Sequence, residues 1–237
     1  MSRRTEVRDK RKGQRRRNTT VLIVVIAAVA LIITALLIAQ NNQPVGEIVT
    51  PEPKTYAQVN GQSIGDPNAP VKMDEYSDFQ CPYCGVFGEE IFPLIHRDYI
   101  QTGLVYFTFH HMPFADGHSA TKESTHAAMA SVCAAQQGKF FEFHDLLFAN
   151  LTGENIGSFT EKRLYAMAEI AGLDSDAFDT CYRDPATVEA VDMDKAAGLR
   201  AGIDSTPSFL INGTLFLGAQ PYSEFQSAIN AALEASS

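Results

Sequence analysis

Lys and Arg are scarce in most of this 237-residue chain. Nine of the 19 lie within residues 1–20, which leaves ten for the remainder, where 26 of the 28 Asp and Glu residues lie. The formal net charge of −9 therefore averages a short basic arm with a strongly acidic body. Phosphate backbones are bound by clustered Lys and Arg, so the acidic body excludes nucleic acid as its main partner.

Cysteine is also scarce, and the pattern of the four residues argues against a metal site. Cys81 and Cys84 form one Cys-x-x-Cys motif, whereas Cys133 and Cys181 are isolated and lie 48 positions apart. A structural zinc site would need a second such motif or a paired-histidine site. No histidine is spaced as a ligand partner of the cysteines, and His144 is interpreted as a packed helix residue. The sequence predicts neither a metal nor a cofactor.

One long hydrophobic run precedes the acidic body. Residues 21–39 (VLIVVIAAVALIITALLIA) carry no charge and one polar side chain, Thr34. A helix of this length spans roughly 28 Å, close to the hydrocarbon thickness of a bilayer. A cleaved signal peptide is the alternative, but its apolar core would have only about 7–15 residues, and Leu37-Ile38-Ala39 is a poor cleavage site. We therefore expect an uncleaved transmembrane helix in contact with the lipid bilayer.

The charges on either side of this run predict its orientation. Nine basic residues precede it, and Lys54 is the only basic residue within the 20 residues that follow. By the positive-inside rule, the N-terminus is cytoplasmic and the acidic body lies outside the cell membrane. Residues 40–55 contain three prolines and few large apolar side chains, which predicts a semi-extended linker. The folded domain is expected to cover residues 56–237.

The body alternates between strand and helix patterns. Strand patterns cover residues 56–64, 71–77, 104–110, 208–211 and 214–217, with two-residue hairpin turns at Asn60-Gly61 and Asn212-Gly213. Helix patterns cover residues 85–101 (interrupted at Pro93), 119–137, 140–150, 160–171, 185–201 and 221–235, with a short turn around 175–182. The order is β-α-β, a run of helices, then β-β-α. This order predicts an α/β sheet with a helical insertion at about residues 118–202.

The motif Cys81-Pro82-Tyr83-Cys84 follows a predicted strand and opens a predicted helix. A helix N-terminus offers free N–H groups and a partial positive charge, so a thiol there can have a pKa of about 3.5–7 instead of about 8.5. We expect Cys81 to be exposed at the helix tip and Cys84 to be shielded within the first turn. This asymmetry predicts that Cys81 exchanges disulfides with a substrate and that Cys84 resolves the mixed disulfide. An inert structural disulfide is the alternative, although so short a loop adds little stability.

The chain resembles the DsbA-like branch of the thioredoxin superfamily over roughly residues 56–235. The resemblance lies in residues 65–84 (GDPNAPVKMDEYSDFQCPYC), 128–145 (with SVCAAQQGKFFEFHD), 202–213 (GIDSTPSFLING) and 216–225 (FLGAQPYSEF). It implies a thioredoxin-like fold with an inserted helical domain, in agreement with the order of elements above.

The resemblance also implies roles for residues outside the Cys-x-x-Cys motif. Glu75 lies where relatives place a buried acid beneath the active-site disulfide, and burial would raise its pKa and suit it to accept a proton from Cys84. An ordinary surface glutamate is the alternative. Thr206-Pro207 matches the cis-proline loop that pairs with an extended substrate chain, although a strand-initiating proline remains the alternative.

Cys133 and Cys181 both fall within the predicted helical insertion. An even cysteine count outside the membrane favours pairing, and some relatives carry a second disulfide in this region. We expect a structural Cys133–Cys181 disulfide, with two free buried thiols as the alternative.

The resemblance implies a membrane-anchored, extracytoplasmic thiol–disulfide oxidoreductase that introduces disulfides into exported proteins. Its partners would be reduced or misoxidised exported clients and a quinone-linked membrane reoxidase. A disulfide reductase or isomerase in the same compartment is the first alternative, because the direction depends on a reduction potential that the sequence does not give. A non-catalytic metal carrier or binding protein on the same fold is the second. Glu75, Thr206-Pro207 and the intact Cys-x-x-Cys motif count against it.

Overall fold

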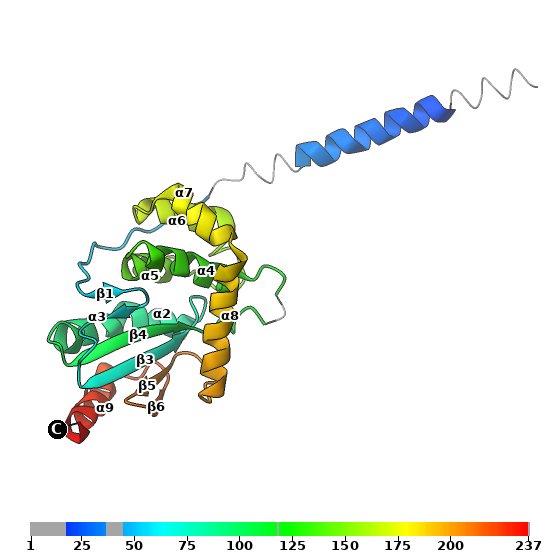
Figure 1. Ribbon diagram of the computed structural model, residues 1–237. Helices are drawn as coiled ribbons and strands as arrows, with labels where there is room; N and C mark the ends of the chain where they lie inside the picture. The colour runs from blue at the N-terminus through cyan, green and yellow to red at the C-terminus, as the bar shows by residue number, and fades with distance from the viewer. Residues whose placement is uncertain (1–17, 37–44, 118, 237) are drawn as a thin grey trace, which may run out of the picture. The chain divides into compact units, whose positions relative to one another are not determined.

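The computed structural model describes residues 18–36, 45–117 and 119–236 (Figure 1). It divides the chain into two units, residues 1–44 and 45–237. Most of the predicted basic arm (residues 1–20) lies outside the described residues, as do residues 37–39 of the predicted anchor and 40–44 of the predicted linker.

In the first unit, Asn18–Leu36 form a helix that is long and apolar enough to cross a membrane. Thr34, the polar side chain within the uncharged run, donates its hydroxyl to the carbonyl oxygen of Ala30 at 2.8 Å. This bond pairs the hydroxyl within the helix itself, which an apolar environment requires.

The second unit is built on one mixed sheet, whose strand order in the described residues is β1-β2-β4-β3-β5-β6. The strands are β1 (Val59–Asn60), β2 (Ser63–Ile64), β3 (Val71–Ser77), β4 (Val105–His111), β5 (Ser208–Ile211) and β6 (Thr214–Leu217). β3 and β4 are parallel, and all other neighbours are antiparallel. A parallel pair needs a long crossover, and the helical segment between β3 and β4 provides it.

This crossover is helical from Pro82 to Ile100. It comprises α2 (Pro82–Val86), the π-helical turn η1 (Phe87–Ile91), α3 (Phe92–Ile95) and the π-helical turn η2 (His96–Ile100). The interruption predicted at Pro93 is therefore a change of helix type and not a gap. Pro93 sits in the first turn of α3, where its missing N–H is tolerated.

Aromatic side chains fill the main core on one face of the sheet. Phe209 of β5 packs at ring-centroid distances of 4.6 Å from Phe87 and 5.0 Å from Phe225, which belongs to α9 (Tyr222–Ala235). On the other face, Tyr76, Met112 and Ile203 form a smaller cluster beneath α8 (Pro185–Arg200). Gly198 lets α8 approach closely, because a Cβ there would lie 2.6 Å from the Met112 sulfur.

The helical insertion lies between β4 and β5. It comprises α4 (Glu123–Gln136), α5 (Phe140–Ala149), α6 (Glu161–Ile170), α7 (Ser175–Arg183) and α8. α7 is a full helix where the sequence predicted only a short turn. The Asp174 carboxylate caps it by accepting the N–H of Ala177 at 2.8 Å, and Asp184 caps α8 in the same way through Ala186.

The first hairpin turn lies one residue later than predicted. Asn60 pairs with Ser63, so the turn residues are Gly61 and Gln62 and not Asn60 and Gly61. Gly61 has a φ of +62°, and Gln62 is not among the residues with positive φ. A turn with glycine at its first central position has this geometry, whereas Asn-Gly at the centre requires positive φ at both residues.

The predicted linker is largely docked. Residues 45–56, called the strap below, run along the helical insertion, so the compact unit begins at Val45 and not at Tyr56. The amide of Asn150 binds both backbone groups of Val49: its Oδ1 accepts the Val49 N–H at 2.9 Å, and its Nδ2 donates to the Val49 carbonyl at 2.8 Å. Arg163 donates to the carbonyls of Val45 and Glu47 at 2.8 and 3.1 Å. The proline content correctly predicted an extended backbone. It could not predict the docking, because the partners Asn150 and Arg163 lie about 100 residues away in sequence.

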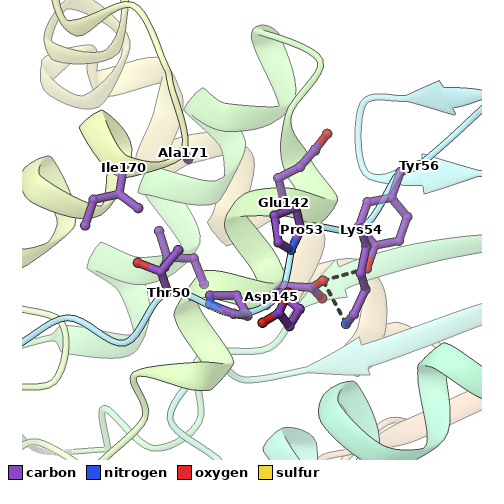
Figure 2. Close-up of a pocket in the computed structure, with 11 residues that line it drawn as sticks. Thr50, Pro53, Lys54, Tyr56, Glu142, Asp145, Ile170 and Ala171 are labelled. Carbon is purple, nitrogen blue, oxygen red and sulfur yellow. Dashed lines mark hydrogen bonds and ion pairs between the residues drawn. The ribbon is translucent and has the colours of Figure 1, made fainter.

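The C-terminal end of the strap converges on one buried carboxylate. Figure 2 shows Lys54 and Tyr56 pointing toward Asp145 of α5, at 2.9 and 2.7 Å from its Oδ2. A cavity of about 180 Å³ remains between the strap and the helices α5 and α6. None of the residues predicted to react lines it.

Candidate active site

Cys81 and Cys84 lie at the N-terminus of α2, directly after the sheet end where β3 stops. Cys81 is the N-cap residue, Pro82 occupies the first helical position and Cys84 is fully buried. Both thiols are free in this structure, and Cys81 is half-buried. The dipeptide between them is turned outward, with Tyr83 69% exposed. Cys84 is shielded within the first turn, as the motif predicted, whereas Cys81 lies at the helix tip but is half-buried and not exposed.

The surroundings of the two thiols shift their pKa values in opposite directions. A hydrogen bond from the Cys84 thiol is the largest cause that lowers the pKa of Cys81, to about 6. Burial opposes this shift, while the Thr206 side chain and the backbone N–H groups of Cys84 and Tyr83 add to it. Burial is the main cause that raises the pKa of Cys84 well above its ordinary value. Near neutral pH, Cys81 is therefore mainly a thiolate and Cys84 a thiol.

Thr206 and Pro207 lie beside Cys81, immediately before β5. β5 runs antiparallel to β3, with Ser208 opposite Tyr76, and this register brings the start of β5 to the sheet end that carries the cysteines. The Thr206–Pro207 peptide bond is cis. In the thiol form, the Cys81 sulfur donates to the carbonyl oxygen of Thr206 at 3.4 Å.

Glu75 is completely buried within β3. Neither carboxylate oxygen makes a hydrogen bond of normal geometry with the described residues. Burial raises its pKa to about 8, a shift that the nearby Ser77 hydroxyl opposes and the charge of Cys81 increases. Its negative charge in turn helps to raise the pKa of Cys84. Glu75 is thus a protonated carboxyl group at neutral pH, close to both cysteines.

Asp78 and Gln80, which precede the Cys-x-x-Cys motif, form a network of buried hydrogen bonds that the sequence did not indicate. The Asp78 carboxylate accepts the N–H groups of Gln80 and Ala115 at 2.8 and 2.7 Å. The backbone carbonyl of Asp78 accepts the N–H of Cys81 at 3.0 Å. The buried Gln80 accepts the Ser124 hydroxyl at 2.8 Å. These bonds fix the loop that precedes α2 to the loop after β4 and to α4.

A histidine pair at the end of β4 was also missed. The Asp194 carboxylate of α8 lies 2.7 Å from His110 Nδ1 and accepts the N–H of His111 at 2.7 Å. Burial opposes a charge on His110, but Asp194 and Asp74 outweigh it and raise its pKa to about 9. His110 is thus a cation that ties α8 to the sheet. Only the fold brings these residues together, since Asp194 follows His110 by 84 positions.

Cys133 and Cys181 are joined by a disulfide that links α4 to α7, with their Cα atoms 5.7 Å apart. Among the described residues, no cluster of three His, Cys, Asp or Glu side chains is placed to hold a metal ion.

Comparisons with known proteins identify the family and the fold of the chain. A family profile described as Thioredoxin matches residues 57–231. Disulfide bond formation protein D of Bacillus subtilis is 29% identical over 191 residues, which cover 74% of this chain and 79% of that protein. Na(+)/H(+) antiporter NhaA 3 of Salinispora tropica is 32% identical over 149 residues, or 63% of this chain. The chain spans only 21% of that antiporter's length.

Solved structures show the same fold. Wolbachia pipientis alpha-DsbA1 superimposes with a TM-score of 0.65 and 27% identity, covering 79% of this chain and 95% of that one. Oxidised BdbD from Bacillus subtilis superimposes with a TM-score of 0.65 and 24% identity, covering 80% of this chain and all of that one. The fold and the paired cysteines define a thioredoxin-fold protein with a dithiol centre and an inserted helical domain. The chain belongs to the thioredoxin family, in its DsbA-like branch.

Proposed function

We propose that the folded unit is an extracytoplasmic thiol–disulfide oxidoreductase that introduces disulfides into exported proteins. The observation that carries this proposal is the pair of opposite pKa shifts at one helix tip: Cys81 lowered to about 6 and Cys84 raised. A stabilised thiolate at Cys81 stabilises the reduced form of the dithiol and makes its disulfide a stronger oxidant.

In the oxidising direction, Cys81 and Cys84 begin as a disulfide. A client thiolate attacks the Cys81 sulfur, which breaks the Cys81–Cys84 bond, forms a mixed disulfide and releases the Cys84 thiolate. A second client thiolate then attacks the client sulfur of that mixed disulfide and releases the Cys81 thiolate. The client loses two electrons and two thiol protons and gains a disulfide. The cysteine pair gains the electrons, the Cys84 thiolate takes up one of the two protons that the client thiols lose, and the second proton passes to solvent.

The surrounding residues fit separate parts of this cycle. Glu75, buried beside both cysteines, exchanges the proton that Cys84 gains or loses. Thr206 stabilises the Cys81 thiolate, and its backbone, next to Pro207, pairs with an extended client chain. Pro82 starts α2, and the outward-turned Tyr83 lies where an approaching client passes.

The N-terminal helix is proposed to anchor this unit in the cell membrane, with the N-terminus in the cytoplasm. The basic residues before the run support this orientation, and residues 21–39 would contact lipid. Reoxidation of the dithiol needs an electron acceptor, for which a quinone-linked membrane reoxidase is proposed. Protease added outside the cell should degrade the folded unit; protection of this unit from that protease would refute the orientation.

Two measurements test the proposed reaction. Equilibration of the full chain with glutathione buffers should give a reduction potential nearer the oxidising value of about −120 mV than the thioredoxin value of about −270 mV. A potential near the latter would favour the reductase or isomerase instead. Cys84→Ala should trap exported clients as mixed disulfides through Cys81, and Cys81→Ala is the matched control. Absence of trapped clients, together with stoichiometric bound metal, would favour the metal carrier.

A further inference from the structure

Asp78 is a buried acid with no role in the reaction described above. It is 2% exposed and lies in the turn between β3 and α2, three residues before Cys81. Burying a carboxylate costs free energy even when it is well hydrogen-bonded. Both of its oxygens are used, because Oδ1 accepts the N–H of Gln80 and Oδ2 accepts that of Ala115. An asparagine has only one accepting oxygen, so this pair of bonds requires an ionised acid.

The backbone of Asp78 acts on both cysteines. Its carbonyl accepts the N–H of Cys81 at 3.0 Å, which closes the turn that leads into α2. A backbone hydrogen bond from Asp78 also lowers the pKa of Cys84, against the larger effect of burial. The N–H is the group of a peptide that donates, so this bond directs the Asp78 N–H toward the buried sulfur. The main causes that shift the two cysteine pKa values include this backbone but not the charge of Asp78.

The Asp78 carboxylate fastens this backbone to the loop after β4. Its bond to the N–H of Ala115 joins residues 37 positions apart. The next residue, Asp116, is also buried, and it accepts the N–H groups of Ser124 and Thr125 at 2.9 and 3.0 Å in the first turn of α4. The loop is therefore held at α4, and it gives the carboxylate a fixed support. The direction of the Asp78 peptide groups thus depends on the side chain of the same residue.

We propose that Asp78 is a positioning residue for disulfide exchange, whose carboxylate holds its own backbone N–H toward the sulfur of Cys84. This inference rests on the proposed function. When a client thiolate attacks Cys81, a bond forms between the client sulfur and the Cys81 sulfur, and the bond to Cys84 breaks. The electron pair of the broken bond stays on the Cys84 sulfur, which leaves as a thiolate. Burial disfavours that charge, so a donor already in place lowers the barrier to breaking the bond.

Positioning and charge predict opposite effects when Asp78 is replaced. If the negative charge of Asp78 acted directly on the cysteines, its removal would favour both thiolates and make the disulfide a stronger oxidant. If the carboxylate positions the turn, its removal loosens the backbone donor. The leaving thiolate of Cys84 then loses stabilisation, so exchange becomes slower and the disulfide a weaker oxidant. The direction of the change therefore separates the two explanations.

The test compares variants of the oxidised full chain in detergent micelles. Asp78→Ala removes both accepting oxygens, whereas Asp78→Asn removes the charge and keeps one of them. Two rates are followed by acid quenching and mass spectrometry: reduction of the protein by dithiothreitol and oxidation of a synthetic peptide with two cysteines. Both rates should fall about tenfold in Asp78→Ala and by a smaller factor in Asp78→Asn. In glutathione buffers the equilibrium constant for reduction of the disulfide should fall about tenfold in Asp78→Ala, which lowers the reduction potential by about 30 mV.

Glu123→Ala is the matched control. Glu123 is also a 2% exposed acid whose carboxylate accepts two backbone N–H groups, those of Gly157 and Phe159, both at 2.9 Å. Its removal destabilises the fold in the same way as the removal of Asp78, because two buried N–H groups lose their acceptor. The bonds of Glu123 do not involve the turn before α2, so the exchange rates and the reduction potential should stay unchanged in Glu123→Ala.

Several results would overturn the inference. One is a set of rates and a potential in both Asp78 variants equal to those of the unmodified chain. A second is faster exchange and a higher potential in both variants, because the charge would then be the cause. A third is equal slowing in Asp78→Ala and Glu123→Ala. If Asp78→Ala does not fold, Asp78→Asn decides the test by the same criteria. Failure of the unmodified oxidised chain to react with dithiothreitol would instead overturn the proposed redox function.

Discussion

The Cys81 sulfur lies 3.4 Å from the carbonyl oxygen of Thr206, although 125 positions separate the two residues in sequence. The same residue lowers the pKa of Cys81 through its side chain. The antiparallel pairing of β5 with β3 produces this contact. Thr206 thus connects the reactivity of Cys81 to the loop that would hold a client.

Removing the Thr206 hydroxyl should make Cys81 less acidic. In Thr206→Val the thiolate loses one of its donors, so the pKa of Cys81 should rise from about 6 by roughly one unit. The ultraviolet absorbance of the thiolate as a function of pH measures this shift in the reduced protein. Thr214→Val, which removes an exposed hydroxyl from the far end of β6, should leave the titration unchanged. An unchanged pKa of Cys81 in Thr206→Val would mean that the Cys84 thiol and the helix N–H groups lower this pKa without help from Thr206.

Glu75 should make the protein less stable as the pH rises. Its pKa is raised from 4.5 to about 8 by burial, so between these values the folded state binds a proton that the unfolded state has lost. Stability from this group is complete below about pH 4.5 and is lost as the pH rises through about 8, by at most about 5 kcal/mol. Glu75→Gln retains a neutral side chain of the same shape and should remove this loss.

The Glu75 measurement is cleanest in the oxidised protein, because the cysteines then do not titrate. Urea unfolding at about pH 5 and about pH 8 should show a smaller difference in Glu75→Gln than in the unmodified chain. Asp78, whose pKa burial raises to about 6, contributes in the same direction in both proteins and cancels. Identical pH dependence in the two proteins would contradict a buried, protonated Glu75.

The parts of the fold that depend on local pattern were predictable from sequence. β3, β5 and β6 have the expected bounds, because β3 begins with alternating apolar and polar residues and β5 and β6 are short, largely apolar runs on either side of a hairpin turn. The hairpin turn at Asn212 and Gly213 was also expected, and both residues have positive φ. The first hairpin turn was predicted one residue too early, because Asn60 and Gly61 were assigned to its centre. In the structure Gly61 and Gln62 occupy the centre of the turn.

The parts that depend on tertiary contacts were not predictable from this pattern. Nothing near Val49 in sequence indicates that the amide of Asn150 will bind its backbone. Asp78 and Asp194 read as ordinary surface acids, yet each accepts hydrogen bonds from segments brought together only by the sheet and insertion. The two cysteines at the helix tip were found because helix start, proline and spacing are all local features.

The disulfide between α4 and α7 should be structural rather than redox-active. It joins residues 48 positions apart, and cross-linking a loop of that size stabilises by about 4 kcal/mol in the chain-entropy model. Cys133→Ala/Cys181→Ala should therefore lower the free energy of unfolding by roughly that amount. Peptide oxidation below the new melting temperature should continue. The matched variant Cys81→Ala/Cys84→Ala should abolish oxidation without this loss of stability; the opposite pattern would refute the assignment.

The strap should contribute to the stability of the folded unit rather than serve only as a tether. A chain that begins at Ala57 loses the bonds from Asn150 and Arg163 to the strap backbone. It also leaves the Asp145 carboxylate, 8% exposed, without Lys54 and Tyr56. Unpairing a buried carboxylate destabilises, so we expect a loss of about 3 kcal/mol relative to a chain that begins at Val45. For a unit of this size the melting temperature should fall by roughly 6–12 °C.

Single substitutions separate these contacts from the effect of shortening the chain. In the chain that begins at Val45, Asn150→Ala should reproduce part of the loss, because Val49 then has no partner for its N–H and carbonyl groups. Asn68→Ala removes an exposed amide from a loop outside the strap and should change the melting temperature little. Equal melting temperatures for the chains beginning at Val45 and Ala57 would show that the strap is a passive linker. The folded unit would then start close to Tyr56, where the proline-rich sequence first placed its beginning.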